Sequence, residues 1–291
     1  MDEFLTRCDG KNVGWGLAPR GRKGEMKMTP KPFLHVLITG TLTLGIISVV
    51  NAKPPGKAKD WKIVWQDEFQ GEKIDLKKWD YWHPDTKRRK AINKAHNTYL
   101  DGKGNLVIRT QKEGNAFTAG GIWTPKTFKH KFGYWEFRCS FEQIDNIGHW
   151  PACWVHTPNM GKYIGDPNRG GIEIDVMELP RRDDSTQHAI HWDGYKKDHK
   201  SRSKKFKIKN LMKGFHTFGL WWTEKELVFY VDDKETWRYP ISSHMEQYII
   251  LSEEIDTWGG PIEKKNANLP DYFLVDYVRV YMPKGKAELK R

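Results

Sequence analysis

The feature that most constrains this chain is a short segment, residues 171–180, in which carboxylates alternate with aliphatic side chains. Its residues Ile172, Ile174 and Val176 favour a β-strand, because branched side chains suit a pleated, half-buried surface. Side chains in a strand point alternately to opposite faces. Glu173 and Asp175 therefore share one face, and the branched residues form the other.

The third acid of the segment, Glu178, comes one position too late for this alternation. Strict alternation would place Met177 beside the acids and turn Glu178 into the apolar layer, where an unpaired charge is costly. One extra residue, a β-bulge, returns Glu178 to the acidic face. We therefore predict a bulge near Val176 and Met177.

Three carboxylates on one face repel one another, and packing gives no reason to gather them. Glycoside hydrolysis with retention requires such a group, because one carboxylate attacks the sugar while a second carboxyl protonates the leaving oxygen. Asp175, between the two glutamates, would orient Glu173 and spread the pKa values of the set. A calcium-binding acidic cluster and a solvated edge strand are the alternatives that the spacing leaves open.

Residues 33–50 form the long apolar run of the chain and follow Lys27 and Lys31. Small residues precede a cleavage point after Ala52, so we predict that residues 1–52 are an N-terminal extension and secretion signal. The protein is then secreted or periplasmic, with no stable membrane insertion after cleavage. The alternative is a membrane anchor formed by residues 33–50, since 18 residues is near the minimum that spans a bilayer.

The chain of 291 residues carries a formal net charge of +12, and cleavage after Ala52 leaves 42 Lys and Arg against 33 Asp and Glu. A basic surface suits an anionic partner such as a sulfated polysaccharide, or serves solubility. No nucleic-acid-binding module is recognisable, which argues against a nucleic-acid partner. The 14 Trp and 11 Tyr residues offer flat surfaces for stacking sugar rings, or serve the core.

Two cysteines, Cys139 and Cys153, remain after cleavage and are centred on the turn-like residues 145–148. We expect residues 133–141 and 149–155 to form a hairpin, which would place the two cysteines nearly opposite each other. A disulfide and a pair of buried free thiols are both compatible with this spacing, because it does not fix the direction of the Cβ atoms.

Short strand patterns separated by turn signals recur along the chain, with little helical periodicity. The fold class is therefore all-β, an antiparallel β-sandwich. We expect a linker at 53–60, one domain at 61–282 and a basic tail at 283–291. Residues 70–98 are expected to form a long surface connection around Trp79 and Trp82, and residues 196–210 an exposed lysine-rich loop. The expected strands are 61–65, 105–109, 133–141, 149–155, 172–178, 186–192, 215–222, 227–231, 248–252 and 273–281.

Several sequence blocks besides the acidic segment carry a family resemblance. They are 65–69 (WQDEF), 133–138 (GYWEFR), 150–154 (WPACW), 215–220 (FHTFGL) and 274–281 (LVDYVRVY). Together with Glu-x-Asp-x-x-Glu at 173–178, these blocks resemble glycoside hydrolase family 16 from about Trp61 to Tyr281. The resemblance implies a jelly-roll, concanavalin-like sandwich whose concave sheet forms a glycan cleft.

The resemblance also implies roles for the acids in a retaining reaction. Glu173 is the expected nucleophile, Asp175 its orienting partner, and Glu178 the general acid and then the general base. No cofactor is expected for this catalysis.

Four residues are expected to contact substrate. Strand parity places Trp150 and Trp154 on one face with Ala152 between them, as stacking walls for sugar rings, and a core role is the alternative. His191 matches a histidine that the family places in the cleft, although a single His is more often structural. Asn97 matches an asparagine that contacts sugar in many members.

Many members of the family also bind a structural calcium ion on the convex side of the sandwich. The matching positions here are Glu68 and Asp276, with the carbonyl of Gly104 as a third oxygen. Oxygen ligands from distant segments suit calcium.

The bulged signature sets this chain apart from relatives with a compact Glu-x-Asp-x-Glu form, and the block at 150–154 resembles β-1,3-glucanases (laminarinases). The resemblance thus implies a monomeric, secreted, retaining endo-glycosidase acting on a β-1,3- or β-1,3-1,4-glucan. Residues 191–195 and the basic stretch after them depart from that pattern and leave sulfated algal galactans such as agarose, porphyran or carrageenan as the alternative. A non-catalytic glycan-binding protein is a further alternative, since some relatives have lost their acids.

Overall fold

The computed structural model describes residues 54–56, 58–178, 183–262 and 268–285. The predicted secretion signal and most of the predicted basic tail lie outside these residues. Within them, no helix is long and apolar enough to cross a membrane.

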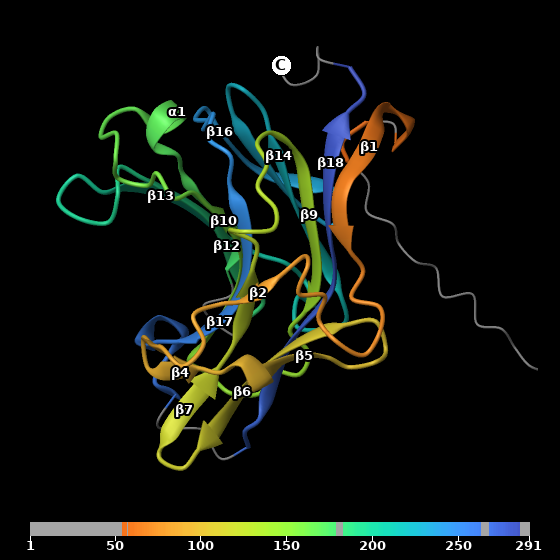
Figure 1. Ribbon diagram of the computed structural model, residues 1–291, viewed down its shortest axis with the longest axis vertical. Coiled ribbons are helices and arrows are strands. Elements are labelled where there is room, and N and C mark those ends of the chain that lie inside the picture. Colours follow the sequence, from red (N-terminus) through yellow and green to blue (C-terminus); the bar gives the residue numbers. More distant parts are fainter. Residues whose placement is uncertain (1–53, 57, 179–182, 263–267, 286–291) are drawn as a thin grey trace, which may run out of the picture. The chain divides into compact units, whose positions relative to one another are not determined.

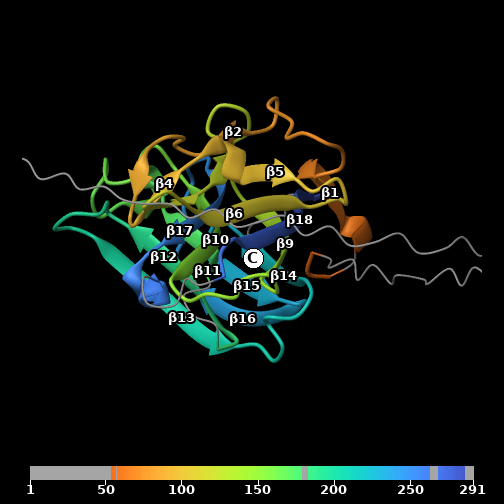
Figure 2. The ribbon, with the colours of Figure 1, turned by 90° about the horizontal axis from the view of Figure 1, so that it is seen from below.

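The described strands form two sheets that pack face to face, with short helical turns between them (Figures 1 and 2). The larger sheet has the order β16 (Lys234–Tyr239), β15 (Leu227–Val231), β14 (His216–Trp222), β9 (Gly133–Ser140), β18 (Asp271–Pro283), β6 (Leu106–Glu113), β7 (Ala116–Ala119), β4 (Ala91–Asn93) and β3 (Lys87–Arg88). In it, β1 (Trp61–Asp67) also pairs with β18, and β5 (Thr98–Leu100) with β6.

The smaller sheet has the order β13 (Lys200–Lys207), β12 (Ser185–Trp192), β11 (Glu173–Glu178), β10 (His149–His156), β17 (Tyr248–Ile255), β8 (Gly121–Trp123) and β2 (Asp80–Tyr81). The helical turns are α1 (Pro167–Gly170), η1 (Ala58–Asp60), η2 (Ala95–Asn97) and η3 (Thr257–Gly259). The predicted antiparallel β-sandwich is confirmed, and each of the ten expected strands overlaps an observed one.

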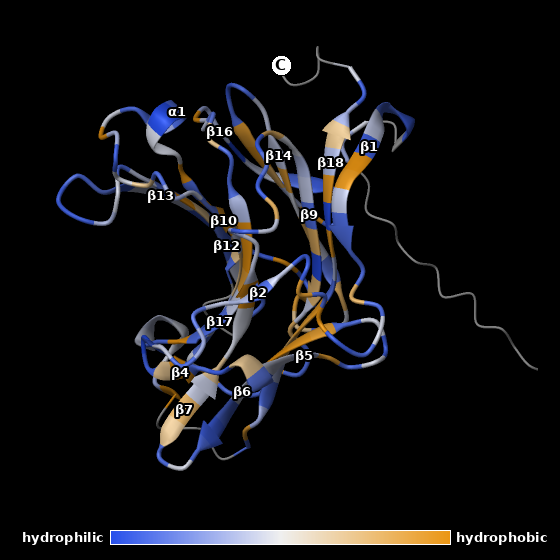
Figure 3. Ribbon diagram, viewed as in Figure 1, coloured by the Kyte–Doolittle hydropathy of each residue, from blue (hydrophilic) through white to orange (hydrophobic). Residues whose placement is uncertain are grey.

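The core lies between the two sheets and is built by the inward faces of their strands. Phe137 on β9 and Val278 on β18 are fully buried in one cluster with Val155, Ile174 and Ile190 of the smaller sheet. Hydrophobic bands accordingly alternate with hydrophilic ones along β9, β14 and β18 (Figure 3). Each such side chain contributes roughly 1.5–3 kcal/mol when it is fully buried, so the sandwich fixes the smaller sheet firmly.

The predicted bulge in β11 is confirmed. Asp175 pairs with Ala189 of β12 and Glu178 pairs with Gln187, so three steps along β11 match two steps along β12. The register between β10 and β11 shifts at the same place. Val176 and Met177 are both fully buried, which means that the extra residue allows two consecutive apolar side chains to enter the core while Glu178 stays on the outer face.

The expected hairpin between residues 133–141 and 149–155 is wrong. β9 pairs with β14 and β18 in the larger sheet, whereas β10 pairs with β11 and β17 in the smaller one. The connection crosses from one sheet to the other, and both the backbone N–H and the side chain of Asn146 donate to Asp271 on β18. Cys139 and Cys153 still meet, because their strands face each other across the core, but both are buried free thiols.

Two expected irregular segments contain regular structure. Residues 196–210 include β13, an exposed edge strand paired along its whole length with β12. Lysines on an edge strand discourage pairing with another chain. They also give β13 a polar composition that is typical of a loop, which explains the wrong expectation. Residues 70–98 include β2, β3 and β4, and their Trp79 and Trp82 are buried rather than exposed.

Candidate active site

A cavity of about 620 Å³ lies over the outer face of the smaller sheet, and all three acids of β11 line it. Its remaining lining residues are largely aromatic, cationic or histidine side chains that come from both regular strands and irregular segments. They include Trp82, His83, Arg88, Arg89, Trp123, Trp150, Trp154, His156, Gln187, His191, Tyr195, His199, Tyr248, Glu254 and Trp258.

Glu178 sits between two N–H donors. The indole Nε1 of Trp150 donates to its Oε1 at 2.8 Å, and Nε2 of Gln187 donates to its Oε2 at 2.9 Å. Burial raises the pKa of the Glu178 carboxyl, while the donors from Gln187 and Trp150 act in the opposite direction, since they favour the ionised form. This carboxyl is therefore buried, oriented at both oxygens and poised to exchange a proton.

Glu173 lies at the other end of the acidic row, beside a different set of partners. The hydroxyl of Tyr195 donates to its Oε2, and Nε2 of His156 lies 3.5 Å from the same oxygen. Burial raises the pKa of Glu173 to about 7, opposed by the Tyr195 hydrogen bond and reinforced by the charge of Glu178.

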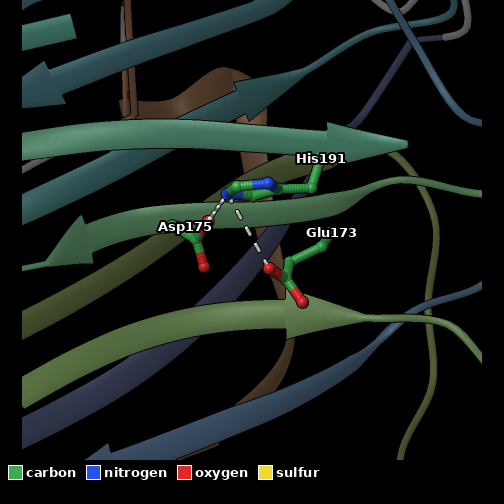
Figure 4. A group of neighbouring side chains, drawn as sticks. All are labelled: Glu173, Asp175 and His191. Carbon is green, nitrogen blue, oxygen red and sulfur yellow. Dashed lines mark ion pairs between the residues drawn. The ribbon is translucent and has the colours of Figure 1, made fainter. Parts of the chain in front are cut away.

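Asp175 lies between the two glutamates along β11, and His191, which pairs with Glu173 on β12, lies close to it (Figure 4). Nε2 of His191 is 3.5 Å from Oδ2 of Asp175 and 4.0 Å from Oε1 of Glu173. Burial, followed by Glu178 and Glu173, raises the pKa of Asp175 well above its usual range. Burial and the adjacent His199 lower the pKa of His191 to about 4. The His191 ring is therefore neutral near pH 7, and the protonated form of Asp175 is favoured.

One atom from each of Glu173, Asp175 and His191 lies within 4.8 Å of the others, which resembles the spacing of a metal site. We assign no metal to this group, because the raised pKa of Asp175 disfavours the ionised form that a metal ion binds, and Tyr195 already occupies one oxygen of Glu173. The spacing fits a reacting carboxylate flanked by orienting groups.

The structure brings Trp150, Trp154 and His191 into the cavity with the acids, as predicted from strand parity and from the resemblance. Trp150 faces Trp258 edge-on, with ring centroids 4.4 Å apart, and Nε1 of Trp154 donates to the Ser252 hydroxyl at 3.0 Å. Their contact with sugar stays a prediction. The alternative core role does not fit, since both indoles are partly exposed.

Asn97 is not brought into the cavity. Its side chain is fully buried, with Nδ2 donating to the Thr118 hydroxyl at 2.9 Å and Oδ1 accepting from Arg109 at 3.0 Å. These bonds join η2 to β6 and β7. The structure thus gives Asn97 a supporting role at the edge of the larger sheet, in place of the predicted sugar contact.

The carboxylates expected to bind calcium are already paired with arginines. Glu68 forms two hydrogen bonds with Arg279, each at 2.7 Å, and Asp276 forms an ion pair with Arg138. A cation would have to displace these guanidinium groups, so the donor set, with or without the Gly104 carbonyl, does not fit calcium in this arrangement. Calcium binding stays a prediction.

Sequence reasoning missed much of the cavity wall. Trp82, Arg88 and Arg89 come from the segment interpreted as a surface connection, and Tyr195 and His199 from the loop between β12 and β13. Arg88 stacks over Trp82 at 4.2 Å, and Arg89 stacks over Trp150 at 4.9 Å. The signal that could have identified Trp82, Arg88 and Arg89 is the clustering of Trp and Arg residues within an otherwise polar stretch of sequence.

Comparisons with known proteins agree with the geometry. The family model described as "Glycosyl hydrolases family 16" matches residues 86–261. The chain is 26% identical to a beta-glucanase of Rhodothermus marinus, over 80% of this chain and 90% of that protein. It is 28% identical to a keratan-sulfate endo-1,4-beta-galactosidase of Sphingobacterium multivorum, over 76% of this chain but only 55% of that protein.

Among solved structures, the laminarinase from Flavobacterium sp. UMI-01 matches with a TM-score of 0.64 and 25% identity, over 76% of this chain and the whole of that one. The family match spans more than half of the chain and contains the whole acidic strand and most of the cavity wall. The chain therefore belongs to glycoside hydrolase family 16.

Proposed function

We propose that this enzyme is a retaining endo-hydrolase of a β-1,3- or β-1,3-1,4-glucan. The observation that carries the proposal is the bulged β11, which presents Glu173, Asp175 and Glu178 side by side in a cavity walled by tryptophans. Retaining hydrolysis needs two carboxyl groups on opposite sides of the scissile bond, and tryptophan faces provide platforms for the flanking sugars. The beta-glucanase and laminarinase relatives support a glucan as the substrate.

In the proposed reaction, Glu173 attacks the anomeric carbon as the glycosidic C–O bond breaks, and Glu178 gives its proton to the leaving oxygen. The product of this step is a glycosyl ester on Glu173. A water molecule then adds to the anomeric carbon and gives a proton to Glu178. The bond between the anomeric carbon and Glu173 breaks, and its electron pair returns to the Glu173 carboxylate. Asp175 and the neutral ring of His191 orient Glu173.

The two catalytic roles are tested by substitution. Glu173→Ala and Glu178→Ala should each lower the cleavage of laminarin by several orders of magnitude, with Glu72→Ala, an exposed glutamate outside the cavity, as the matched control. Azide should restore turnover by Glu173→Ala with an inverted glycosyl azide as product, and turnover by Glu178→Ala with a retained one. Normal cleavage by either alanine variant would refute the assignment.

The substrate is tested by digesting laminarin, mixed-linkage glucan, agarose, porphyran, carrageenan and keratan sulfate, with sizing of the products. Release of short oligosaccharides from the two glucans supports the proposal, and proton NMR of the first product gives the anomeric configuration. Cleavage of a galactan alone would replace the glucan by the second candidate.

That second candidate is an anionic β-galactan, and a specific observation favours it. Arg88 and Arg89 both line the cavity, with side chains that are 33% and 48% exposed. Arginine recognises sulfate and carboxylate groups through its planar fork of donors. Each arginine is also paired with Glu254, at 2.8 and 3.7 Å respectively. This pairing reduces the positive charge available to an anionic substrate, so we prefer the neutral glucan as the substrate.

A further inference from the structure

Tyr195 makes a contact with the acidic row that the reaction described above does not use. It lies in the loop between β12 and β13, with an exposed ring and a hydroxyl that donates to Oε2 of Glu173. Burial of the hydroxyl and the adjacent Glu173 raise the pKa of Tyr195 above its usual range. The phenol therefore stays protonated and can act only as a donor to this carboxylate.

Tyr195 is the last member of a chain of hydrogen bonds that begins at Tyr248 on β17. The hydroxyl of Tyr248 lies 3.0 Å from Nδ1 of His156, and Nε2 of His156 lies 2.8 Å from the Tyr195 hydroxyl. Burial lowers the pKa of His156 to about 4, so its ring is neutral and has one N–H. A proton on Tyr248 directed to Nδ1 leaves that N–H on Nε2, where it donates to Tyr195.

This chain is held in place by strands and by a tightly packed loop. His156 and Tyr248 are directly paired residues of β10 and β17, and the rings of His156 and Tyr195 are stacked within 14° of parallel. At the base of the loop, Asp193 accepts from the Gly165 N–H and from Lys200, both at 2.8 Å. The position of Tyr195 is thus built into the fold.

We propose that Tyr195 is a catalytic residue that holds Oε2 of the nucleophile, and that His156 and Tyr248 position it. This rests on the proposed role of Glu173. With Oε2 held, Oε1 is left to bond to the anomeric carbon in the first step. In the second step that bond breaks and its electron pair returns to the carboxylate, where the Tyr195 hydrogen bond strengthens as the negative charge develops.

Few other groups around Glu173 favour its ionised form. The charges of Glu178 and Glu254 raise the pKa of Glu173, and among the charges acting on it that of Arg88 lowers it. His191 and His156 carry no charge near pH 7. Loss of the Tyr195 hydroxyl should therefore raise the pKa of the nucleophile and make the carboxylate a poorer leaving group from the glycosyl ester.

The experiment is Tyr195→Phe, studied with an aryl β-glycoside of the oligosaccharide that the wild-type enzyme releases. The acidic limb of the pH profile of kcat/KM should move up by about one pH unit, since the nucleophile must be ionised. At the pH optimum, kcat should fall roughly 10- to 100-fold while kcat/KM falls much less, because breakdown of the glycosyl ester becomes rate-limiting. Mass spectrometry of the quenched enzyme should then show the glycosyl adduct on Glu173.

Tyr163→Phe is the matched control, because Tyr163 is also an exposed tyrosine but lies outside the cavity. His156→Gln, which keeps an N–H donor, should retain more kcat than His156→Leu. An unchanged acidic limb with no adduct would overturn the role of Tyr195, as would a rise in kcat/KM, which would mean that Tyr195 obstructs the substrate. If Glu173→Ala stays active, the assigned nucleophile itself is wrong, so the two failures are distinguishable.

Discussion

The two glutamates that flank the scissile bond in the proposed reaction differ in their hydrogen-bond partners, although both stand on the same strand. Glu178 accepts from an indole and an amide, whereas Glu173 accepts from a phenol that is itself oriented by His156. N–H donors on both oxygens hold Glu178 in one orientation, while Glu173 is held at Oε2 by Tyr195 and its Oε1 lies 4.0 Å from Nε2 of His191. The partners of each carboxyl thus suit the role proposed for it.

Trp150→Phe tests the partner of Glu178. The substitution removes the Nε1–H donor to Oε1 but keeps an aromatic ring. That donor lowers the pKa of Glu178, so its loss should raise this pKa further. Since the general acid must be protonated, the basic limb of the pH profile of kcat/KM should move to higher pH, and kcat should fall about 10-fold.

Trp154→Phe is the comparison for this prediction, because its indole donates to the Ser252 hydroxyl and not to a carboxylate. Trp154→Phe should change KM only through the stacking of sugar on its ring, and the basic limb of its pH profile should stay in place. A basic limb that moves equally in both variants would show that the Trp150 hydrogen bond does not set the pKa of Glu178.

At the scale of single elements, β11 shows how one inserted residue reconciles two demands. The acids require one face and the core requires the other, and the bulge at Val176 and Met177 satisfies both. This could be predicted from the sequence, because a misplaced Glu in an apolar layer is energetically implausible.

Deletion of Val176 is the direct test of this view. It leaves Glu-Ile-Asp-Met-Glu, in which strict alternation keeps all three acids on the outer face. We expect a folded protein that has lost one buried side chain, with a free energy of unfolding lower by about 1–3 kcal/mol and with measurable hydrolysis.

Deletion of Ile174 is the matched control, because it also removes one buried aliphatic residue but makes Glu173 and Asp175 adjacent, so that one of them must face the core. This variant should fail to fold or should lack activity. Equal stability of the two deletions, measured by urea unfolding, would contradict the proposed function of the bulge.

A buried charged group joins the two sheets beneath the cavity and gives a second prediction about elements. His149 on β10 lies 2.9 Å from Glu253 on β17 and 2.9 Å from Asp271 on β18. These carboxylates outweigh burial and raise the pKa of His149 to about 9. Because the usual value is about 6.5, the stabilisation is complete below that pH and is lost as the pH rises to about 9.

The free energy of unfolding should therefore fall by up to about 3 kcal/mol between pH 6.5 and 10 through this residue. Burial also raises the pKa of Glu253, whereas the hydrogen bonds from His149 and Asn146 outweigh burial and lower that of Asp271. Urea unfolding of His149→Gln should show a smaller loss over this range than the wild type. His156→Gln, which replaces a histidine with a lowered pKa, should keep the wild-type slope.

The wrong predictions of elements have a common physical reason, which is that the sequence pattern of a strand does not specify its partners. Alternation along residues 133–141 and 149–155 identifies two half-buried strands, but it carries no information on their partners, and so a sheet-to-sheet crossing was interpreted as a hairpin. β13 forms because β12 offers it a full row of backbone partners, against its lysine-rich composition. Tyr195 and His156 meet at Glu173 from separate elements, a proximity that only the folded chain defines.

At the scale of the whole molecule, the basic side chains of the edge strand β13 differ in whether they lie on the face of the sheet that carries the cavity. Residues paired directly across antiparallel strands point to the same face, so Lys205 shares the outer face with Gln187 and Glu178. Lys204, its neighbour, pairs with His188 and points the other way. Both lysines are exposed, but only Lys205 extends the row of the acids toward the edge of the sheet.

This arrangement predicts how an anionic polysaccharide should bind. In the inactive Glu173→Gln protein, Lys205→Gln should weaken binding of keratan sulfate several-fold at low salt, and Lys204→Gln should weaken it less, because only the first change removes charge from the cavity face. Raising NaCl from 50 to 500 mM should reduce the difference, since the screening length falls from about 14 Å to about 4 Å. Binding of neutral laminarin should change little in either variant. If the two lysines prove equivalent for keratan sulfate, the basic charge acts as a general surface field and does not belong to the cleft.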